Sequence, residues 1–551
     1  MEQRAVARAA YPTFWQRVVA SWVSVPLWGW CLAFFVVALA FNLYRLGSPS
    51  IWFDEAFSVE LARQPLPSLW HIIWGPEPNM ELYYLFLHYW LAFTAFLGLH
   101  PVEWVVRLPS AIFAALSTVM VFLLGRRFLS LPCGLLAASL YLLNDLQLVY
   151  AQQTRSYSMQ LLLLCFACYA LCSALTVDSP SCQKRWWVCF VASASLALYA
   201  HLFSLLILFA LLCSLAVLLL PNAWRPALRQ RLRPLLLSFI SIVILSMPVL
   251  LESLHGAKTD WLPDPRLHDI YGLFLTMSGE SKLFLLLNAG CCAIVLAWLL
   301  LPRLWPGFVA REGEGSGKVS DRERLAAQRF SRQAMPIAVV LLCWLLLPVV
   351  VSFMVSQGLP RLFSSRYLVV VVPPFCLLVA LGVASVRWPA LRVALALALL
   401  LAALSVVPHY YASAQVEDWN TATFWLEQHY RPGDGLVCYD NAVEQGCQIS
   451  VQYYLDAYPT GAHFTADTPG AFSWQQFGPA NPASGPDTAT DPAALSAFGA
   501  QHPRIFFIVG RLPDDAAAAR AKAAQHWLDT HYRFIAQIVT RTVTVRLYAT
   551  H

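Results

Sequence analysis

Two adjacent carboxylates, Asp54 and Glu55, lie in the segment SPSIWFDEAFSVE (Ser48–Glu60), which follows the apolar run Val25–Tyr44. A carboxylate at the edge of a membrane can accept a proton from an attacking hydroxyl group, which is general-base catalysis. The residues from Asp54 onward also resemble the start of a helix, where capping and the helix dipole favour acids. One acid can begin a helix while the other does chemistry, so the pattern permits both roles.

A second group of residues, mostly cationic, falls at the ends of other apolar segments. Its members are Arg45, Arg107, Arg155, Arg361 and Arg366, together with His201, Tyr157 and Tyr367. A single arginine there could simply extend its charge to the interface. Several arginines near two acids and a histidine favour a bound anion instead, because guanidinium groups match phosphate with paired donors. A phosphate at a membrane surface most naturally belongs to a lipid.

The composition of the chain indicates a membrane protein, so apolar helices must position these residues. The chain has 551 residues, of which 58% are hydrophobic and only 12% are charged. Soluble domains are about 45–50% apolar and about 25% charged. Repeated apolar runs of roughly 20 residues predict helical spans rather than a barrel. The net charge of +6 lies in short loops between these runs, so nucleic acid is not an expected partner.

The basic loops decide how the twelve apolar runs are threaded. These loops are the N-terminus (Arg4, Arg8 and Arg17), Arg126–Arg127, Lys184–Arg185, Arg225–Arg233, Arg303–Arg332 and Arg387–Arg392. If every run crosses, most of these loops fall outside, against the usual bias of positive loops to the cytoplasm. If the aromatic run Asn79–Leu99 lies along the outer surface, all of them fall inside. We therefore predict eleven crossing helices plus one interfacial helix, with twelve crossings as the alternative.

This topology places five segments on the outer side. They are Arg45–Trp104, Tyr150–Ser156, Leu254–Ser281, Gln357–Arg366 and the tail from His409. Asp54 and Glu55 then share one side with the arginines. The first apolar run is expected to be an uncleaved signal-anchor. We predict a membrane-embedded catalytic domain over residues 1–408 and an extracytoplasmic domain over residues 409–551.

The tail predicts a small α/β domain. Helices are expected at Glu417–Tyr430 and Pro513–Tyr532, and buried strands at Gly435–Asp440 and Arg504–Gly510. Alternating residues predict a final strand at Val539–Thr550. Cys438 and Cys447 could form a disulfide in an oxidising compartment or remain free thiols.

Several motifs resemble one family of membrane enzymes. They read IWFDEAFS, NMELYYLFLHYW, VVRLPSAIFAALSTVMVFLLGRR, YAQQTRSYSMQLLL, LYAHLFSLLI, SSRYLVVVVPPF and, in the tail, EDWNTATFWLEQHYRPGDGLVCYD. Their order is similar to that in GT-C-fold glycosyltransferases, particularly bacterial relatives of the protein O-mannosyltransferases and the lipid A aminoarabinose transferase. The resemblance covers Val25 to about Asp440. Each motif alone is weak, and the specificity comes from their order and spacing.

The resemblance implies an enzyme that moves a sugar from a polyprenyl phosphate to an acceptor on the outer face and inverts the anomeric centre. Asp54 would be the general base, and Glu55 would orient the acceptor or the sugar. The implied phosphate and donor residues are Arg107, Arg155, Tyr157, His201, Arg361, Arg366 and Tyr367. Glu81 and Tyr83 would lie on the acceptor or sugar side. Many relatives have HPPLYY where this chain has PNMELYY (residues 78–84), which leaves the sugar and acceptor preference open.

The expected partners are a polyprenyl-phosphate-linked sugar, an acceptor lipid, glycan or protein, and membrane lipids. The expected location is the bacterial inner membrane, with the tail periplasmic or extracellular. No metal site is predicted; two adjacent acids could hold a divalent ion, although hard ions prefer more oxygen ligands.

Two other functions use similar residues. A flippase or transporter would need internal repeats and polar residues deep in its spans, which the sequence does not show. A polysaccharide polymerase or ligase would take its glycan from a lipid diphosphate and would not need the acidic pair.

Overall fold

The structure is a computed structural model that describes residues 25–551. Within that range it leaves out residues 76, 78, 222–224, 256–258, 260–261, 305–320, 359, 441–445, 475–476, 478–485 and 513. The basic N-terminal residues Arg4, Arg8 and Arg17 lie outside the described residues, as do positions 305–320 of the predicted basic loop.

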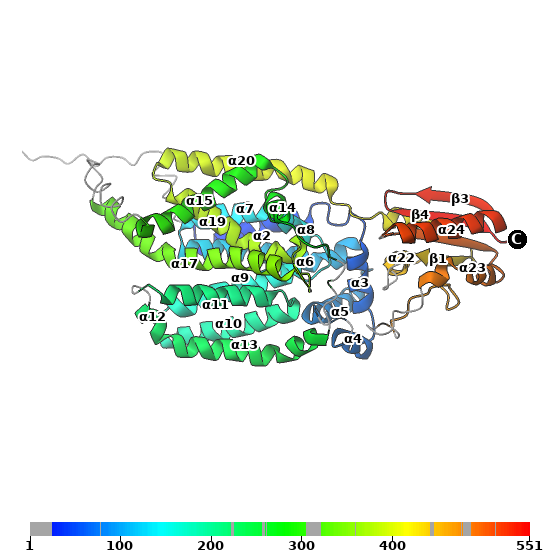
Figure 1. The fold of residues 1–551 in the computed structure, drawn as a ribbon, viewed down its shortest axis with the longest axis horizontal. Coiled ribbons are helices and arrows are strands. Elements are labelled where there is room, and N and C mark those ends of the chain that lie inside the picture. The colour runs from blue at the N-terminus through cyan, green and yellow to red at the C-terminus, as the bar shows by residue number, and fades with distance from the viewer. Residues whose placement is uncertain are drawn as a thin grey trace, which may run out of the picture.

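A bundle of long apolar helices forms most of the molecule (Figure 1). Its helices are α2 (Leu27–Leu43), α6 (Glu103–Phe128), α7 (Leu131–Leu142), α8 (Asp145–Ala151), α9 (Tyr157–Thr176), α10 (Pro180–Ala200), α11 (Ser204–Leu219), α13 (Leu232–Glu252), α15 (Lys282–Leu304), α17 (Asp321–Val355), α19 (Val372–Ser385) and α20 (Pro389–Ser413). Short connecting elements are α12 (Arg225–Gln230), η1 (Ser253–His255), α14 (Leu267–Thr276), α18 (Ser365–Leu368) and η2 (Val369–Val371).

These helices confirm a polytopic helical membrane protein. Among the described residues, seven helical segments are long and apolar enough to cross a bilayer, or eight if α7 and α8, which meet at a 62° bend, form one span. The helices α2 and α11 are apolar but shorter. Because length and composition alone do not settle which helices cross, the count of eleven stays a prediction.

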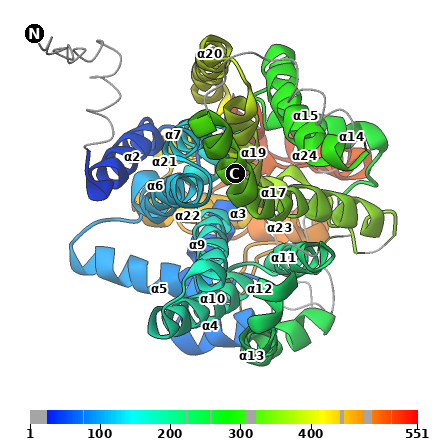
Figure 2. The same cartoon turned by 90° about the vertical axis from the view of Figure 1, so that its left-hand side faces the viewer.

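Three helices cover one end of the bundle: α3 (Phe53–Ala62), α4 (Leu66–Ile73) and α5 (Glu81–Phe96). Figure 2 shows α5 side-on, whereas α6, α9 and α10 are seen nearly end-on. Just before α5, Asn79 accepts a hydrogen bond from the backbone N–H of Leu202, beyond the end of α10. Further along α5, Trp90 donates to the carbonyl of Val105 near the start of α6. Both ends of α5 therefore lie at one end of the bundle, which favours the interfacial helix over the twelve-helix alternative.

Two of the predicted basic loops meet at the opposite end, where α12 lies (Figure 1). Arg127, at the end of α6, donates to the hydroxyl of Tyr169 and lies over the ring of Trp186. Arg231 donates to the carbonyls of Ala174 and Val177 after α9. This separation of basic loops from the α3–α5 end is the arrangement that the charge bias predicts.

The tail forms a mixed sheet with helices. Its elements are α21 (Trp419–His429), β1 (Gly435–Tyr439), α22 (Gly446–Ala457), η3 (Pro486–Thr490), α23 (Pro492–Gly499), β2 (Arg504–Gly510), α24 (Asp515–His531), β3 (Arg533–Val539) and β4 (Val543–Ala549). The strand order is β1-β2-β4-β3, with β1 parallel to β2 and the other pairs antiparallel. The predicted α/β class is confirmed, and Cys438 is bonded to Cys447.

Two details of the tail differ from the sequence prediction. The predicted strand Val539–Thr550 is wrong in its extent, because Val539 ends β3 and β4 begins only at Val543 after a tight turn. The helix α20 runs to Ser413, past the predicted division at residue 408. That division of the chain into two domains stays a prediction.

The tail and the α3–α5 end share one hydrophobic core. Its buried side chains come from α3, α5, α21, α22 and strands β1, β2 and β4, and include Phe53, Trp419 and Tyr454. A continuous core of this kind fixes the tail against the helices that carry the acidic pair, because core side chains pack closely and leave little room for sliding.

We predict that Gly134→Ala lowers the stability of the bundle. An added Cβ at Gly134 would lie 2.7 Å from both the carbonyl oxygen of Phe122 and the backbone nitrogen of Arg126, where α7 meets α6. Overpacking of this kind costs about 1–3 kcal/mol. Thermal unfolding in detergent measures the loss. Gly290→Ala is the matched control, because its Cβ would meet no atom within 4 Å; equal melting temperatures for both variants would contradict the prediction.

Candidate active site

Asp54 is the centre of a charged cluster at the end of the bundle. It is the second residue of α3, and its side chain is 18% exposed. Its Oδ2 atom lies 3.0 Å from Nη1 of Arg366, just after the start of α18, and 3.9 Å from Nη2 of Arg155. The fold therefore brings together an acid and two cations that are about 100 and 300 residues from it in sequence.

Arg155 also fixes the backbone that carries the acid. It lies in the turn between α8 and α9, and its Nη1 atom donates to the carbonyl of Asp54 at 3.1 Å and to the hydroxyl of Ser58 at 3.0 Å. The guanidinium of Arg366 lies 5.5 Å from the ring centroid of Trp52. Both cations thus contact α3 or the residue before it, and Arg366 also donates to the Asp54 carboxylate.

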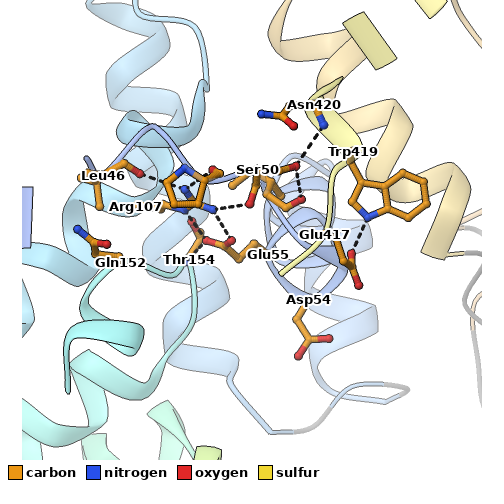
Figure 3. A network of polar contacts seen from close by, with 12 residues as sticks. Leu46, Ser50, Asp54, Glu55, Arg107, Gln152, Thr154, Glu417, Trp419 and Asn420 are labelled. Carbon is orange, nitrogen blue, oxygen red and sulfur yellow. Dashed lines mark hydrogen bonds and ion pairs between the residues drawn. The ribbon is translucent and has the colours of Figure 1, made fainter. Parts of the chain in front are cut away.

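Glu55 has a different environment from its neighbour. Its carboxylate is fully buried and forms a two-point ion pair with Arg107, with N–O distances of 2.8 Å and 2.7 Å. Oε1 also accepts the backbone N–H of Thr154 at 2.7 Å. Figure 3 shows this pair packed together while Asp54 points away from it. Both oxygens of Glu55 are therefore occupied by the protein itself.

The remaining donors of Arg107 bind the loop before α3. They donate to the carbonyls of Leu46, Pro49 and Ser50 at 2.8–3.0 Å. Together with the bonds to Glu55, these contacts use all five N–H groups of the guanidinium. The predicted roles of Arg107 in holding phosphate and of Glu55 in orienting the acceptor or the sugar do not fit this geometry, because every N–H group of Arg107 binds the protein and the Glu55 carboxylate is fully buried against protein donors. Their contacts fix the loop and α3 instead.

A group of aromatic rings packs beside the charged cluster. The ring centroid of His201 lies 5.4 Å from those of Tyr157 and Tyr367, and Tyr157 packs on Tyr150. Nδ1 of His201 accepts the backbone N–H of Phe203. Burial, aided by the charges of Arg155 and Arg366, lowers the pKa of His201 to about 3. The imidazole is therefore neutral at physiological pH, and its buried Nε2 has no hydrogen-bond partner among the described residues.

Two other predicted residues lie near the start of α5. Glu81 and Tyr83 are buried, and neither carboxylate oxygen of Glu81 has a hydrogen-bond partner in the described part of the chain. Burial raises the pKa of Glu81 to about 8, with Glu77 and Glu252 acting in the same direction. A buried acid whose oxygens are unsatisfied is able to receive hydrogen-bond donors from a ligand.

Arg361 lies apart from this cluster. It pairs with Asp264 at 2.9 Å and donates to the carbonyl of Leu262, so it ties its own turn to the loop before α14. Arg45 likewise donates to the carbonyl of Tyr411. The structure therefore brings Arg155, Arg366, His201, Tyr157 and Tyr367 around Asp54 and leaves Arg361 and Arg45 elsewhere.

Two residues that contribute to the site, Trp52 and Ser58, were not predicted from the sequence. Trp52 and Ser58 flank Asp54 within the quoted motif IWFDEAFS, and each contacts one of the two cations. The feature of the sequence that could have identified them is their position close to Asp54. Among the described residues, no group of three or more His, Cys, Asp or Glu side chains is arranged to hold a metal ion.

Comparisons with known proteins agree with this architecture. Residues 85–251 match the family described as dolichyl-phosphate-mannose-protein mannosyltransferase. ArnT from Cupriavidus metallidurans in the apo state is similar over 95% of this chain and 98% of that chain, with a TM-score of 0.56 and 12% identity. The chain has the GT-C fold. With the family match, this indicates a glycosyltransferase, as the sequence predicted.

Two further structures have the same fold. ArnT bound to undecaprenyl phosphate has a TM-score of 0.54, 12% identity and coverage of 95% of this chain and 98% of that chain. The Archaeoglobus fulgidus oligosaccharyltransferase in complex with Zn and sulfate has a TM-score of 0.50, 12% identity and coverage of 94% and 73%. No curated protein matches the sequence.

We predict that Glu55→Gln strongly destabilises the protein. The change leaves Arg107 buried, at 2% exposure, without its counter-charge. Removing one partner of a buried ion pair typically costs about 3–5 kcal/mol. The midpoint of thermal unfolding in detergent should fall markedly, whereas Asp529→Asn, which removes a half-exposed ion pair with Arg546 in the tail, should cost about 0–1 kcal/mol. Equal midpoints for the two variants would contradict the assignment.

The raised pKa of Glu81 predicts a pH dependence of stability. The folded state holds a proton on this carboxyl up to about pH 8, whereas the unfolded chain releases it near its ordinary pKa of about 4.5. Stability contributed by Glu81 should therefore fall as pH rises from about 4.5 to about 8 and level off above that. Melting curves of wild type and Glu81→Gln across this range test the sign, with exposed Glu280→Gln as control. A Glu81→Gln curve parallel to wild type would refute the effect.

Proposed function

We propose that this chain is an inverting glycosyltransferase that moves a sugar from a polyprenyl phosphate to a hydroxyl acceptor on the outer face of the bacterial inner membrane. The observation that carries the proposal is the position of the Asp54 carboxylate, 3.0 Å from Arg366 and 3.9 Å from Arg155. An acid and two guanidinium groups in one cluster match the needs of a reaction that removes a proton and releases a phosphate.

In the proposed reaction, the acceptor oxygen attacks the anomeric carbon of the donor. A C–O bond forms to the acceptor as the C–O bond to the phosphate breaks, and the acceptor proton passes to Asp54. The departing polyprenyl phosphate gains negative charge, which Arg155 and Arg366 stabilise. Fixed cations of this kind act on charge that develops in the transition state, so they lower the barrier. No covalent intermediate on the enzyme is needed, in contrast to a retaining pair of carboxylates.

Other residues around Asp54 support the same assignment. The neutral His201 and the hydroxyls of Tyr157 and Tyr367 can hydrogen-bond the donor without adding charge. A cavity of about 720 Å³ lies beside α14 and is lined in part by Phe363, Ser364 and Ser365, the residues that precede Arg366 in the chain. The unsatisfied carboxyl of Glu81 and the neighbouring Tyr83 are proposed to contact the sugar or the acceptor.

The comparisons support a lipid-phosphate-linked sugar as the donor. One similar structure is ArnT bound to undecaprenyl phosphate, and the matching family is named for a dolichyl-phosphate sugar. A lipid phosphate at the membrane surface is compatible with the location of Asp54 at the end of an apolar bundle. We propose that the tail faces the periplasm or exterior on the same side, beside the acceptor, which is a lipid, a glycan or a protein.

The test is transfer from a defined polyprenyl-phosphate sugar by variants of the cluster. Asp54→Asn removes the base while keeping its shape, so the rate should fall by about 10²–10⁴-fold. Arg366→Gln should lower kcat by about a hundredfold, because the phosphate leaving group loses a cation that stabilises its charge. Radiolabelled transfer in nanodiscs measures both, and Asp529→Asn in the tail should match wild type.

Lipid binding separates this proposal from the alternatives. Asp54→Asn should still bind polyprenyl phosphate, because both arginines remain. A flippase would retain sugar-lipid translocation in the same variant, and a polymerase or ligase would use a lipid diphosphate donor. Full transfer activity in Asp54→Asn would rule out its role as the base.

A further inference from the structure

We propose that Glu417 and Arg511 of the tail are positioning residues that hold α3, and therefore Asp54, in its reactive place. This inference rests on the proposed function and adds a role for the C-terminal segment in that same site. It follows from contacts that join the start of α3 to residues more than 360 positions away in the sequence.

The first contact satisfies an unpaired end of α3. The helix begins at Phe53, and its N-cap residue Trp52 makes no side-chain cap. The first N–H groups of a helix lack partners within the helix and need an external acceptor. Oε2 of Glu417 accepts the N–H of Phe53 at 3.0 Å. A residue of the tail thus caps the helix directly beside the proposed base.

The second contact holds Glu417 itself. Trp419 donates its indole N–H to Oε2 of Glu417, and Nε of Arg511 lies 3.4 Å from Oε1. Figure 3 shows Glu417 and Trp419 at the start of α3, on the opposite side of Ser50 from Arg107. The three partners contact both carboxylate oxygens of Glu417, which restricts the orientation of the cap.

The third contact places Arg511 on the helix. Its guanidinium carbon lies 3.8 Å above the ring centroid of Phe53, a close cation–π contact. The backbone of Arg511 has a φ of 51°, in the left-handed region that non-glycine residues rarely adopt. Gly446 packs against the same pair, because a Cβ there would lie 2.1 Å from Nη1 of Arg511 and 2.8 Å from the ring of Phe53. Strained backbone and tight packing are retained where a side chain has a required place.

The loop before α3 is held from the same side. The hydroxyl of Tyr454 accepts the N–H of Ile51 at 2.7 Å, and Ser50 accepts the N–H of Asn420 through its hydroxyl at 3.1 Å. Arg107 holds the opposite side of this loop through the carbonyls of Pro49 and Ser50. The membrane bundle and the tail therefore both bind the short loop before α3, on its two sides. Asp54 follows this loop closely in the chain.

The consequence for catalysis is geometric. Asp54 lies one residue after Phe53, so a shift at the start of α3 displaces the carboxylate from Arg366 and Arg155. A misplacement of about 1 Å can cost about a hundredfold in rate. Because Glu417 and Arg511 do not belong to the pair of cations proposed to hold the phosphate, their loss should lower kcat and leave KM for the donor unchanged.

The experiment compares four variants of the full chain in nanodiscs. Glu417→Leu removes the cap, and Glu417→Gln keeps an acceptor oxygen for Phe53. Arg511→Gly removes the guanidinium where glycine readily adopts the backbone conformation. Asp434→Asn is the matched control, since Asp434 is also buried, accepts a backbone N–H from Arg431 and pairs with Arg504 at the other end of β2.

Two measurements are made on each variant. Hydrogen exchange followed by mass spectrometry reports the protection of residues 53–58, and kinetic assays separate kcat from KM for the donor. We expect faster exchange at 53–58 and about a hundredfold lower kcat in Glu417→Leu and Arg511→Gly, with donor KM unchanged. Glu417→Gln should keep most of both properties, and Asp434→Asn should resemble wild type.

Several results would overturn the proposal. These are wild-type exchange in Glu417→Leu, faster exchange without loss of kcat, or equal losses in Asp434→Asn, which would indicate general weakening of the tail. Failure of the wild-type protein to transfer any polyprenyl-phosphate sugar would count against the proposed function. The exchange rates of residues 53–58 would then decide the positioning proposal by themselves.

Discussion

The buried ion pair between Glu55 and Arg107 is the interaction on which the arrangement of the charged cluster depends. Its two short N–O contacts lie out of solvent, and the guanidinium also binds three carbonyls of the preceding loop. A buried pair is tolerable only when its remaining hydrogen-bonding groups are satisfied, as they are here. The loop, α3 and α6 are thereby joined at the end of the bundle, and the backbone that carries Asp54 is held in place.

Helix geometry explains why two adjacent acids have different environments. Successive residues of an α-helix are rotated by about 100°, since a turn holds 3.6 residues. Once Glu55 is fixed toward α6 by Arg107, Asp54 must face a different direction, toward the turns that carry Arg155 and Arg366. The buried Glu55 fixes the helix, whereas the partly exposed Asp54 faces the cluster of cations. Structural and chemical roles are thus divided between neighbours by rotation alone.

The charge bias of the loops carried much of the sequence prediction. It set which segments share a side, and that was sufficient to gather Asp54, Arg155, Arg366 and His201. It could not assign Arg107, because whether an arginine faces an acid or a ligand depends on the rotation of α6 and on packing that no local pattern encodes. Arg361 was grouped with the site for the same reason, although it binds Asp264.

Long-range capping was equally hidden from the sequence. Glu417 lies in a motif that was visible, but its bond to Phe53 joins positions 364 residues apart. In the tail, alternation continues through residues 539–543 and conceals the turn between β3 and β4. Patterns with period 2 or 3.6 therefore identify elements well, whereas chain reversals within them and contacts between distant elements require the folded chain.

The pairing of Asp54 with Arg366 bears on how a donor would engage the site. The Asp54 carboxylate lies 3.0 Å from this guanidinium. A phosphate has more oxygens and more charge, and it matches paired guanidinium donors well. A donor phosphate that draws Arg366 toward itself would weaken the ion pair, because one guanidinium cannot direct the same N–H groups at both anions. Weakening that pair leaves Oδ2 of Asp54 with fewer hydrogen-bond donors from the protein, so this oxygen can accept one from the hydroxyl of the acceptor. Binding of the proposed donor and readiness of the base would then be linked through a single arginine side chain.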